Sequence, residues 1–495
     1  MMKILLLYPK YPDTFWSFKY ALKFISKKAA FPPLGLLTVA SMLPEAWEKR
    51  LIDMNISALT DADLKWADQV FISAMTVQKK SARDVINRCQ AFRTKIVAGG
   101  PLFTATPEDY KDVDHLILNE AENTLPPFLE DLANGCAQHV YTSDQWPELE
   151  HTPPPRWELV DGKKYVAMSI QYSRGCPFSC EFCDIIVLNG HTPRTKTKNQ
   201  IERELELLYQ RGWKGGIFFV DDNFIGNKKK LKNEILPFLI DWMKQKRYPF
   251  YFFTEASINL SDDEELLQLM VQAGFRRVFI GIETPVEASL VECNKYMNKN
   301  RDLIACVKKI QDFGLEVQGG FIVGFDHDPP SVFEKQISFI QKSGIVTAMV
   351  GLLNAPHGSG LYHRLKTEKR LLDSMSGNNT DFSINFVPKM NREVLVRGYE
   401  KILKTIYSPR HYYERVVTFL KDYKPRQLRK KVYFKLVYIN AFLKSLWFLG
   451  IKNKGRYYYW KLILWTLARR PRFIGYAISF AIYGFHFRKS IEDPS

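Results

Sequence analysis

Three cysteines in one short run could hold a metal cluster. The run Tyr172-Ser-Arg-Gly-Cys-Pro-Phe-Ser-Cys-Glu-Phe-Cys183 contains Cys176, Cys180 and Cys183 in a CxxxCxxC spacing. Iron–sulfur clusters are usually closed by four cysteines, and the remaining ones (89, 136, 293 and 306) are scattered along the chain. Three thiolates would leave one iron of a [4Fe–4S] cluster without a protein ligand. The spacing therefore predicts an open cluster that can bind another molecule and do chemistry on it.

A zinc site and a set of inert thiols are the alternatives. Structural zinc takes four ligands, commonly as two pairs; His191 could complete such a site, but there is no second pair. An odd, clustered set of cysteines does not indicate a disulfide framework. The N-terminal run from Met1 to Pro9 lacks a signal-peptide pattern and is more typical of a β-strand. These features favour a reducing, cytoplasmic location.

Polar residues follow the apolar runs downstream of the cysteines. Asp221, Asp222 and Asn223 come directly after the run at 216–220, and this pattern is typical of either a helix cap or a site. Glu255 and Ser257 end the next run and, because they alternate with Ala256, can face the same side. Glu283 ends the run after that. Either a solvated carboxylate or a binding role fits these acidic residues.

The elements that would position these residues form an α/β series. Between residues 166 and 375 the apolar runs predict strands separated by helices such as 200–211; the strands are 166–171, 216–220, 250–255, 277–282, 316–325 and 347–353. Such a repeat predicts a partial (β/α) barrel, in which functional groups lie on the loops after the strands. The cysteine run follows the first of these strands.

A separate α/β domain is predicted over residues 1–145. Its runs at 3–8, 50–54, 69–73, 95–98 and 115–118 alternate with helices, which predicts an open, mostly parallel, Rossmann-like sheet. Ligands of such sheets bind at the carboxyl ends of the strands, where the sequence places Thr76, Gly99, Gly100 and Glu120. The two glycines fit either a close ligand contact or a simple tight turn. Residues 146–165, rich in proline, are predicted to be a linker.

The last part of the chain, residues 376–495, is predicted to be helical, basic and aromatic. Residues 421–495 carry 17 Lys+Arg against 3 Asp+Glu, or +14 of the total +17, so the first 420 residues carry only +3. Basic and large apolar residues alternate from Lys424 onward, a composition typical of a helix lying at a membrane interface. The apolar stretch 473–487 is shorter than the roughly 20 residues that span a bilayer.

Three interpretations of this tail stay open. Peripheral membrane contact through residues 424–490 uses both its basic and its apolar residues. Nucleic-acid binding would use only the basic ones, and no nucleic-acid partner is expected. A plain helical cap with solvated lysines would use neither.

The cysteine run, with Phe182 before its last cysteine, resembles the signature of the radical S-adenosylmethionine (SAM) superfamily. The resemblance implies that SAM chelates the open iron and that an external electron donor, such as flavodoxin or ferredoxin, drives its cleavage to a radical. It also implies SAM contacts at the strand ends, made by Asp222, Asn223, Glu255, Ser257, Glu283, Gly319 and Gly320.

The order of the two α/β units resembles the cobalamin (B12)-binding class of radical SAM enzymes. Segments such as Phe218–Asn227, Phe253–Ser257, Phe279–Pro285, Gly319–Asp326 and Gly377–Asp381 are similar to the hopanoid C2-methylase group. This resemblance implies a methyltransferase that acts on an unactivated carbon of a lipid-like substrate. It also implies cobalamin contacts by Thr76, Gly99, Gly100 and Glu120.

One departure affects the cobalamin prediction. The usual DxHxxG motif, whose histidine binds cobalt, is absent, and no histidine precedes His115. Cobalamin would therefore bind without that ligand, or the domain would keep the fold and lack the cofactor. The second case favours a radical cyclisation, oxidation or carbon–carbon coupling of a lipid without methyl transfer.

Overall fold

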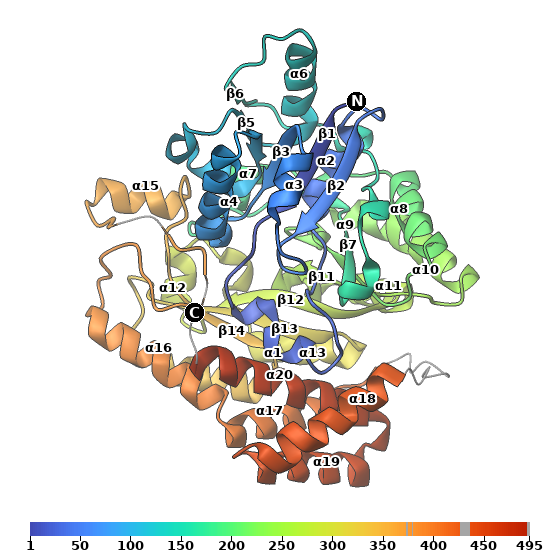
Figure 1. The fold of residues 1–495 in the computed structure, drawn as a ribbon. Coiled ribbons are helices and arrows are strands. Elements are labelled where there is room, and N and C mark those ends of the chain that lie inside the picture. The colour runs from blue at the N-terminus through green and yellow to red at the C-terminus, as the bar shows by residue number, and fades with distance from the viewer. Residues whose placement is uncertain (373–374, 379, 426–435, 493–495) are drawn as a thin grey trace.

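The computed structural model describes residues 1–372, 375–378, 380–425 and 436–492. The chain forms three parts arranged one above another (Figure 1): an α/β domain at the top, a second α/β unit in the middle and a helical region at the bottom. The predicted fold class is confirmed. The basic residues from Arg426 to Lys435, which contribute to the predicted charge of the tail, lie outside the described residues.

The first domain is built on a six-stranded parallel sheet. Its strands, in spatial order, are β2 (Glu48–Asp53), β1 (Lys3–Tyr8), β3 (Gln69–Ser73), β4 (Lys95–Gly99), β5 (His115–Ile117) and β6 (Val140–Tyr141). The connecting helices are α2 (Leu34–Met42), α3 (Asp61–Trp66), α4 (Lys79–Ala91), α5 (Pro101–Ala105) and α6 (Ala121–Ala133). The order 2-1-3-4-5 is that of doubly wound sheets, which bind ligands at their carboxyl edge.

The strands of this sheet are apolar throughout because helices cover both of its faces. Ile4 and Leu6 of β1 pack with α2 and α6, whereas Leu5 and Leu7, which point the other way, pack with α3 and α4. Each side therefore has its own apolar core, and the position of the strand ends is fixed from both sides.

The second unit contains six parallel strands in sequence order. They are β7 (Ala167–Ile170), β10 (Gly216–Phe219), β11 (Tyr251–Ala256), β12 (Phe275–Glu283), β13 (Glu316–Val323) and β14 (Ala348–Leu352). The helices of this unit are α7 (Ile185–Asn189), α8 (Lys198–Gln210), α9 (Lys228–Lys230), α10 (Leu236–Gln245), α11 (Glu264–Ala273), α12 (Glu287–Glu292), α13 (Leu303–Phe313), α14 (Val332–Ser343) and α15 (Gly360–Thr367). Strands in this order form the predicted open barrel.

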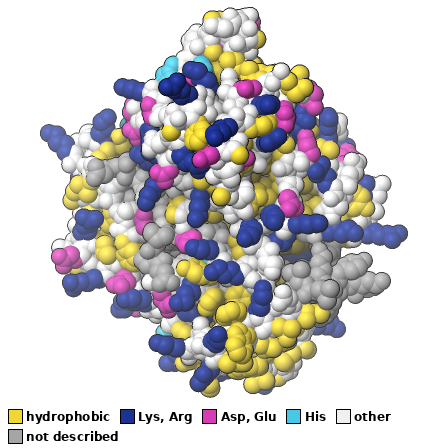
Figure 2. Space-filling view, in the orientation of Figure 1, with side chains coloured by type: hydrophobic (Ala, Val, Ile, Leu, Met, Phe, Trp, Pro, Cys, Tyr) yellow, Lys and Arg dark blue, Asp and Glu magenta, His cyan; other side chains and the backbone are white. Residues whose placement is uncertain are grey.

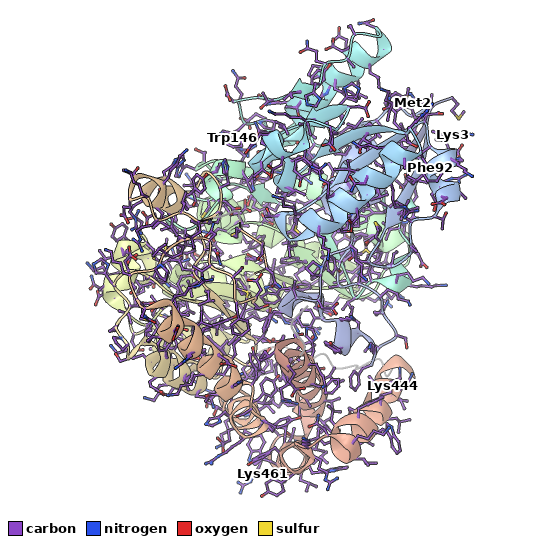
Figure 3. The ribbon with its side chains drawn as sticks, turned by 60° about the vertical axis from the view of Figure 1, so that its left-hand side comes forward. Met2, Lys3, Phe92, Trp146, Lys444 and Lys461 are labelled. Atoms are coloured by element: carbon purple, nitrogen blue, oxygen red, sulfur yellow. The ribbon has the colours of Figure 1, made fainter. Side chains whose placement is uncertain are left out.

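The helical region consists of α16 (Arg392–Ile406), α17 (Pro409–Asp422), α18 (Leu436–Ser445), a π-helical turn (Leu446–Lys452), α19 (Arg456–Arg469) and α20 (Ile474–Glu492). Figure 2 shows hydrophobic side chains gathered on the lower end of the molecule, over these helices. In Figure 3, Lys444 and Lys461 lie at this end, and Met2, Lys3 and Phe92 lie at the opposite end.

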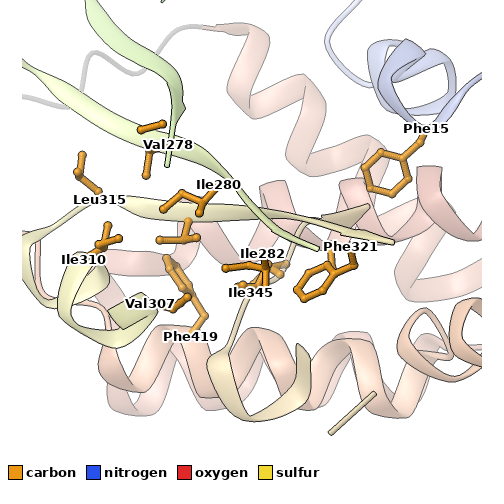
Figure 4. Packing of buried hydrophobic residues seen from close by; sticks show 14 of the residues in the cluster. Phe15, Val278, Ile280, Ile282, Val307, Ile310, Leu315, Phe321, Ile345 and Phe419 are labelled. Atoms are coloured by element: carbon orange, nitrogen blue, oxygen red, sulfur yellow. The ribbon is translucent and has the colours of Figure 1, made fainter. Parts of the chain in front are cut away.

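One apolar core joins the barrel to the helical region. Val278, Ile280 and Ile282 of β12 point to one side of the sheet, where they meet Val307 and Ile310 of α13 (Figure 4). Phe419 of α17 belongs to the same cluster. The alternate residues of the strands face the other side, which we call the inner face of the barrel.

The prediction did not include a long insertion between β1 and α2. Residues 9–33 leave the first domain, descend along the barrel and place the short helix α1 (Lys19–Leu22) beside α20 (Figure 1). The ring of Phe15 stacks on Phe487 at 4.1 Å between centroids, and the buried His486 Nε2 lies 2.9 Å from the Phe15 carbonyl oxygen. The first and last parts of the chain are therefore packed together.

Candidate functional site

The three cysteines lie on one loop between β7 and α8. A two-stranded antiparallel ribbon, β8 (Ser173–Arg174) and β9 (Arg194–Thr195), closes the base of this loop. Gly175 has φ +94°, and a Cβ there would lie 2.7 Å from the Thr192 carbonyl oxygen, so the chain can turn only with glycine. All three thiols are free, and burial raises the pKa of each.

Two strand-end aspartates hold this loop in place. Asp221 accepts hydrogen bonds from the backbone N–H of Tyr172, at 3.2 Å, and from the Ser173 hydroxyl, at 2.6 Å. Asp222 accepts from the Gly175 N–H and the Asn189 side chain, both at 3.0 Å. Burial raises the pKa of Asp221 to about 7 despite these bonds. Both aspartates therefore position the backbone of the cysteine loop.

Asn223 and Ser257 connect the ends of β10 and β11. The Asn223 amide donates to the Ser257 hydroxyl at 3.3 Å and accepts from the Ser257 N–H at 3.2 Å. The Ser257 hydroxyl also donates to the Asn259 side chain at 2.6 Å. The Asn223 side chain is close enough to Cys176 to influence the pKa of that thiol. These two polar side chains therefore lie beside the cysteine loop.

Glu255 is the strand-end carboxylate without a hydrogen-bond partner. It ends β11 on the inner face, and no described residue donates a hydrogen bond to it. Burial, followed by the nearby carboxylates of Asp222 and Asp221, raises its pKa to about 7. A carboxyl group in this state can donate or accept near neutral pH, which makes it available to a ligand.

Glu283 adopts an uncommon backbone conformation at the end of β12. Its φ is +62°, the left-handed region that non-glycine residues rarely occupy, and the pairing with β13 shifts register between Gly281 and Glu283. The shift turns the buried carboxylate toward Lys295, with 2.8 Å between Oε1 and Nζ. A Cβ on Gly281 would lie 2.2 Å from the same carboxylate oxygen. Gly281, Glu283 and Lys295 are thus packed closely against one another.

Lys295 brings a positive charge to the cysteine loop, and sequence reasoning missed it. The side chain is 13% exposed, and Glu283, Cys180 and Cys183 all act to raise its pKa. Its ammonium also lies 6.0 Å from the ring centre of Phe182. The carboxylate at the preceding strand end could have suggested a buried cationic partner, but no spacing rule identifies which lysine it is.

Gly319 and Gly320 allow bulky side chains to lie against β13. A Cβ on Gly319 would lie 2.8 Å from Phe321, and one on Gly320 would lie 2.8 Å from Phe279. The two glycines therefore point to opposite faces of the strand. Gly320 is the one on the inner face, directly beside Gly281 in the register.

The inner face carries half-buried aromatic side chains. Phe218 and Phe253 stack at 5.1 Å between centroids, and Phe31 packs on both. Trp16 lies 5.5 Å from Phe279 and donates from Nε1 to Met349 Sδ at 3.1 Å. Two of these aromatic residues, Trp16 and Phe31, come from the insertion at residues 9–33.

In the first domain, the predicted ligand residues lie at the carboxyl edge of the sheet. Gly99 ends β4, where a Cβ would lie 2.6 Å from the Ile117 carbonyl oxygen, and Gly100 has φ +91°. Thr76 begins a short turn after β3, close to Gly377 of the helical region's leading segment. His115 begins β5, so it lies at the amino end of the strand, away from this edge.

Glu120 takes part in an ion network between the two α/β units. Its carboxylate pairs at 2.5 Å with Arg174 and at 2.5 Å with Arg194, the residues that form the ribbon of the cysteine loop. Arg174 also pairs with Glu122 at 2.8 Å, and this guanidinium holds the pKa of Glu122 low against the effect of burial. These carboxylates are nearly buried, at 7% and 9% side-chain exposure. The predicted contact of Glu120 with cobalamin stays a prediction.

No group of three His, Cys, Asp or Glu side chains among the described residues is arranged to hold one metal ion, as a zinc site would need. The described helices also include none that is long and apolar enough to cross a bilayer.

Family models match three successive parts of the chain. Residues 25–129 match the B12 binding domain, residues 170–340 the radical SAM superfamily, and residues 359–494 a domain of unknown function, DUF4070. The third match covers the helical region, and the family it identifies has no described function.

Two curated relatives match nearly the whole chain. An uncharacterized methyltransferase of Synechocystis sp. is 40% identical over 98% of this chain and 91% of its own length. The hopanoid C-2 methylase of Rhodopseudomonas palustris is 34% identical over 94% of this chain and 90% of its own length.

Solved structures with the same arrangement are more distant in sequence. The cobalamin-dependent SAM radical enzyme OxsB with aqua-cobalamin bound matches with a TM-score of 0.65 at 14% identity, over 99% of this chain and 80% of that one. The radical SAM methyltransferase TsrM from Kitasatospora setae, with cobalamin and a [4Fe–4S] cluster bound, matches with a TM-score of 0.62 at 13% identity over 100% of both chains. At these identities the likeness concerns the fold.

Proposed function

This chain belongs to the cobalamin-binding radical SAM methyltransferases, and on that premise we propose that it methylates an unactivated carbon of a lipid-like substrate of the hopanoid type. The observation that carries the proposal is the 34% identity to a hopanoid C-2 methylase over nearly the full length of both chains. The family uses a [4Fe–4S] cluster, SAM and cobalamin, so this protein does too.

The cysteine loop carries the three thiols that a cluster with one open iron would need. Cys176, Cys180 and Cys183 are free thiols on a single loop whose backbone is fixed by Asp221 and Asp222. We therefore assign the three cysteines as its ligands. When bound, the cluster and SAM supply a radical that removes a hydrogen atom, and cobalamin supplies the methyl group. The protein positions these groups and excludes water, since the cofactors carry the difficult chemistry.

We assign SAM binding to the polar strand ends and to the two glycines of β13. The residues are Asp222, Asn223, Glu255, Ser257, Glu283, Gly319 and Gly320. Glu255 supports the assignment most directly, because desolvation raises the pKa of its carboxyl group to about 7 and the group has no hydrogen-bond partner among the described residues. A half-buried carboxyl group without a protein partner is available to a ligand.

For cobalamin we propose contacts from Thr76, Gly99, Gly100 and Glu120. The glycines lie at the carboxyl edge where such sheets bind ligands, and the turn there needs them: a Cβ on Gly99 would lie 2.6 Å from the Ile117 carbonyl oxygen, and at Gly100 the φ of +91° favours glycine. The two histidines of residues 1–145, His115 and His139, lie at the amino ends of β5 and β6, away from this edge. Cobalt is therefore expected to lack an imidazole ligand from this domain.

The aromatic inner face supports an apolar substrate. Trp16, Phe31, Phe218, Phe253 and Phe279 present ring surfaces on the same side of the sheet as Glu255. Such surfaces bury a rigid hydrocarbon without needing polar partners. The proposal also includes an external one-electron donor and peripheral membrane contact through residues 424–490.

Reconstitution with a hopanoid tests the proposed function. The reduced enzyme, given cobalamin, SAM and a detergent-solubilised hopanoid, is expected to form S-adenosylhomocysteine, 5′-deoxyadenosine and a product one methylene unit heavier. SAM cleavage without S-adenosylhomocysteine, accompanied by a cyclised, oxidised or coupled lipid, would refute methyl transfer. Lipid profiles of a host with and without the gene would then identify the carbon that is modified.

A further inference from the structure

The helical region exposes an unusual number of large apolar side chains. Nine of the nineteen exposed large hydrophobic residues among the described residues fall between positions 439 and 467, and each is 39–68% exposed. We call this set the apolar face; it consists of Ile439, Leu443, Trp447, Phe448, Ile451, Tyr457, Trp460, Leu464 and Leu467. Soluble proteins rarely leave so many large apolar side chains together unless something covers them.

The spacing of these residues places them along one side of each of two helical segments. Positions 439, 443, 447 and 451 follow one another at four-residue steps along α18 and the π-helical turn, and positions 457, 460, 464 and 467 form a stripe on α19. The opposite sides of the same helices are also apolar, with Leu449, Tyr459 and Leu462 buried in the core. A helix that is apolar on both sides needs a second apolar environment.

The two helices lie next to each other, so their stripes form a single surface. Trp460 Nε1 donates to the Gly450 carbonyl oxygen at 3.0 Å, and the Ser445 and Tyr459 hydroxyl groups are 3.0 Å apart. Figure 2 shows the resulting hydrophobic patch at the lower end of the molecule, with Lys and Arg side chains around it.

The positive charge near the apolar face indicates which class of partner covers it. Residues 436–472, which carry the apolar face, contain 8 Lys+Arg and no Asp or Glu. Lys452 stands 5.0 Å from the ring centre of Trp447, and Lys461 lies at the same end of the molecule (Figure 3). A second copy of this chain would bring two surfaces of the same charge together. A nucleic acid would leave the apolar side chains without a partner.

We propose that the apolar face docks the protein on an anionic lipid surface, with α18 and α19 lying along the plane of the interface. Aromatic and aliphatic side chains enter the boundary between headgroups and acyl chains, and the surrounding lysines and arginines meet lipid phosphates. The helices lie on the membrane and do not cross it, in keeping with the lengths of the described helices.

The docking surface is connected to the inner face of the barrel. Phe448 contacts Phe24 edge to face at 5.8 Å between centroids, and Lys444 donates to the Lys23 carbonyl oxygen at 2.9 Å. Both partners belong to the insertion at residues 9–33, which also carries Trp16 and Phe31. Because the docking surface contacts the insertion, the membrane is the source of the apolar substrate, an inference that rests on the proposed function.

Vesicle co-sedimentation tests the docking. The full-length protein is expected to bind vesicles of phosphatidylcholine mixed with phosphatidylglycerol much more strongly than vesicles of phosphatidylcholine alone. The double variant Leu443→Ser/Leu464→Ser should weaken this binding on the order of tenfold or more, because two exposed leucines that would enter the lipid are lost. Leu372→Ser is the matched control, since that leucine is 52% exposed but lies outside the apolar face; it should bind as the wild type does.

Several results would overturn the docking proposal. They are equal binding by the double variant and the wild type, no binding of the wild type to either kind of vesicle, or a wild-type dimer that the double substitution dissociates. A preference for RNA over anionic vesicles would do the same.

Activity separates this proposal from the proposed function. The double variant should keep methyl transfer to a detergent-solubilised hopanoid and lose it when the hopanoid is presented in vesicles. Retention of the vesicle-presented reaction would count against docking. A wild type that methylates in neither presentation would refute the proposed function, whereas sedimentation would still decide the docking.

Discussion

The Lys295 ammonium lies 2.8 Å from the Glu283 carboxylate, and this buried ion pair stands beside the cysteine loop. The carboxylate reaches it only because Glu283 occupies the left-handed region and interrupts the pairing of β12 with β13. Such a conformation costs on the order of 1–3 kcal/mol. The surrounding contacts therefore compensate for backbone strain at the point where the cluster loop meets the barrel.

Removing one partner of this pair should destabilise the protein. Lys295→Met leaves the Glu283 carboxylate buried without a counter-ion, which typically costs about 3–5 kcal/mol. We expect a lower unfolding midpoint in urea and less iron bound per chain after reconstitution. The double variant Lys295→Met/Glu283→Gln, which removes both charges, should recover part of the stability. Unchanged stability in the single variant would show that the pair is not structurally important.

The cluster assignment predicts a sharp loss on replacement of one cysteine. Cys180→Ala should abolish cluster loading, measured by iron content and visible absorbance, and with it SAM cleavage. Cys136→Ala is the control, since Cys136 is exposed and far from the loop in sequence. Full SAM cleavage by the Cys180 variant would refute the assignment.

The protonation of Glu255 predicts a pH dependence of stability. Its pKa is raised from 4.5 to about 7, so the folded apoprotein keeps a proton that the unfolded chain has already lost in that interval. Stability is therefore greatest below the lower value and declines as the pH rises through about 7. Glu255→Gln should flatten this decline in thermal melts of the apoprotein. A slope identical to that of the wild type would mean that Glu255 does not hold this proton.

The ion network predicts coupling between Glu120 and Arg194. Both residues are nearly buried, at 7% and 8% side-chain exposure, so a double-mutant cycle of Glu120→Gln and Arg194→Met should give an interaction energy of about 1–3 kcal/mol in urea unfolding. Cobalamin content distinguishes the two roles of Glu120. If cobalamin is lost with Glu120→Gln but kept with Arg194→Met, the carboxylate contacts the cofactor; equal retention would restrict it to the interface.

The lack of a side chain at residue 320 should determine where the Phe279 ring lies on the inner face. Gly320→Ala would place a Cβ about 2.8 Å from the Phe279 ring, and the ring must then move into the space proposed for the substrate. Because Gly320 is also assigned to SAM, we expect SAM cleavage and methyl transfer to fall together. Full SAM cleavage with reduced methyl transfer would place Gly320 at the substrate and not at SAM, and Gly475→Ala, where no atom lies within 4 Å of the added carbon, is the control.

The strands were predictable because a strand buried on both faces is recognisable in the sequence as a continuous run of apolar residues. The runs Lys3–Tyr8 and Gln69–Ser73 form β1 and β3 with the expected bounds, since helices on both faces require continuous apolar residues. The order of the two α/β units followed in the same way. The ribbon of β8 and β9 was missed, because two residues per strand leave no pattern to recognise.

The partners of the site residues were not predictable from spacing. Lys295, Arg174 and Arg194 are ordinary basic residues in the sequence, and only the fold brings them to Glu283, Glu120 and Glu122. Trp16 and Phe31 were missed for a similar reason. Their neighbours on the inner face, such as Met349 and Phe253, are more than 200 residues away along the chain.

The contact between Phe15 and α20 has a consequence for biosynthesis. Because His486 and Phe487 hold Phe15, the insertion at residues 9–33 cannot reach its final place until nearly the whole chain has left the ribosome. The first α/β domain can fold early, as domains generally do during synthesis. The contacts between the insertion and α20 must therefore form last, because Phe15 and His486 are 471 residues apart along the chain. Premature termination before α20 would therefore yield a protein with an intact first domain and an open barrel.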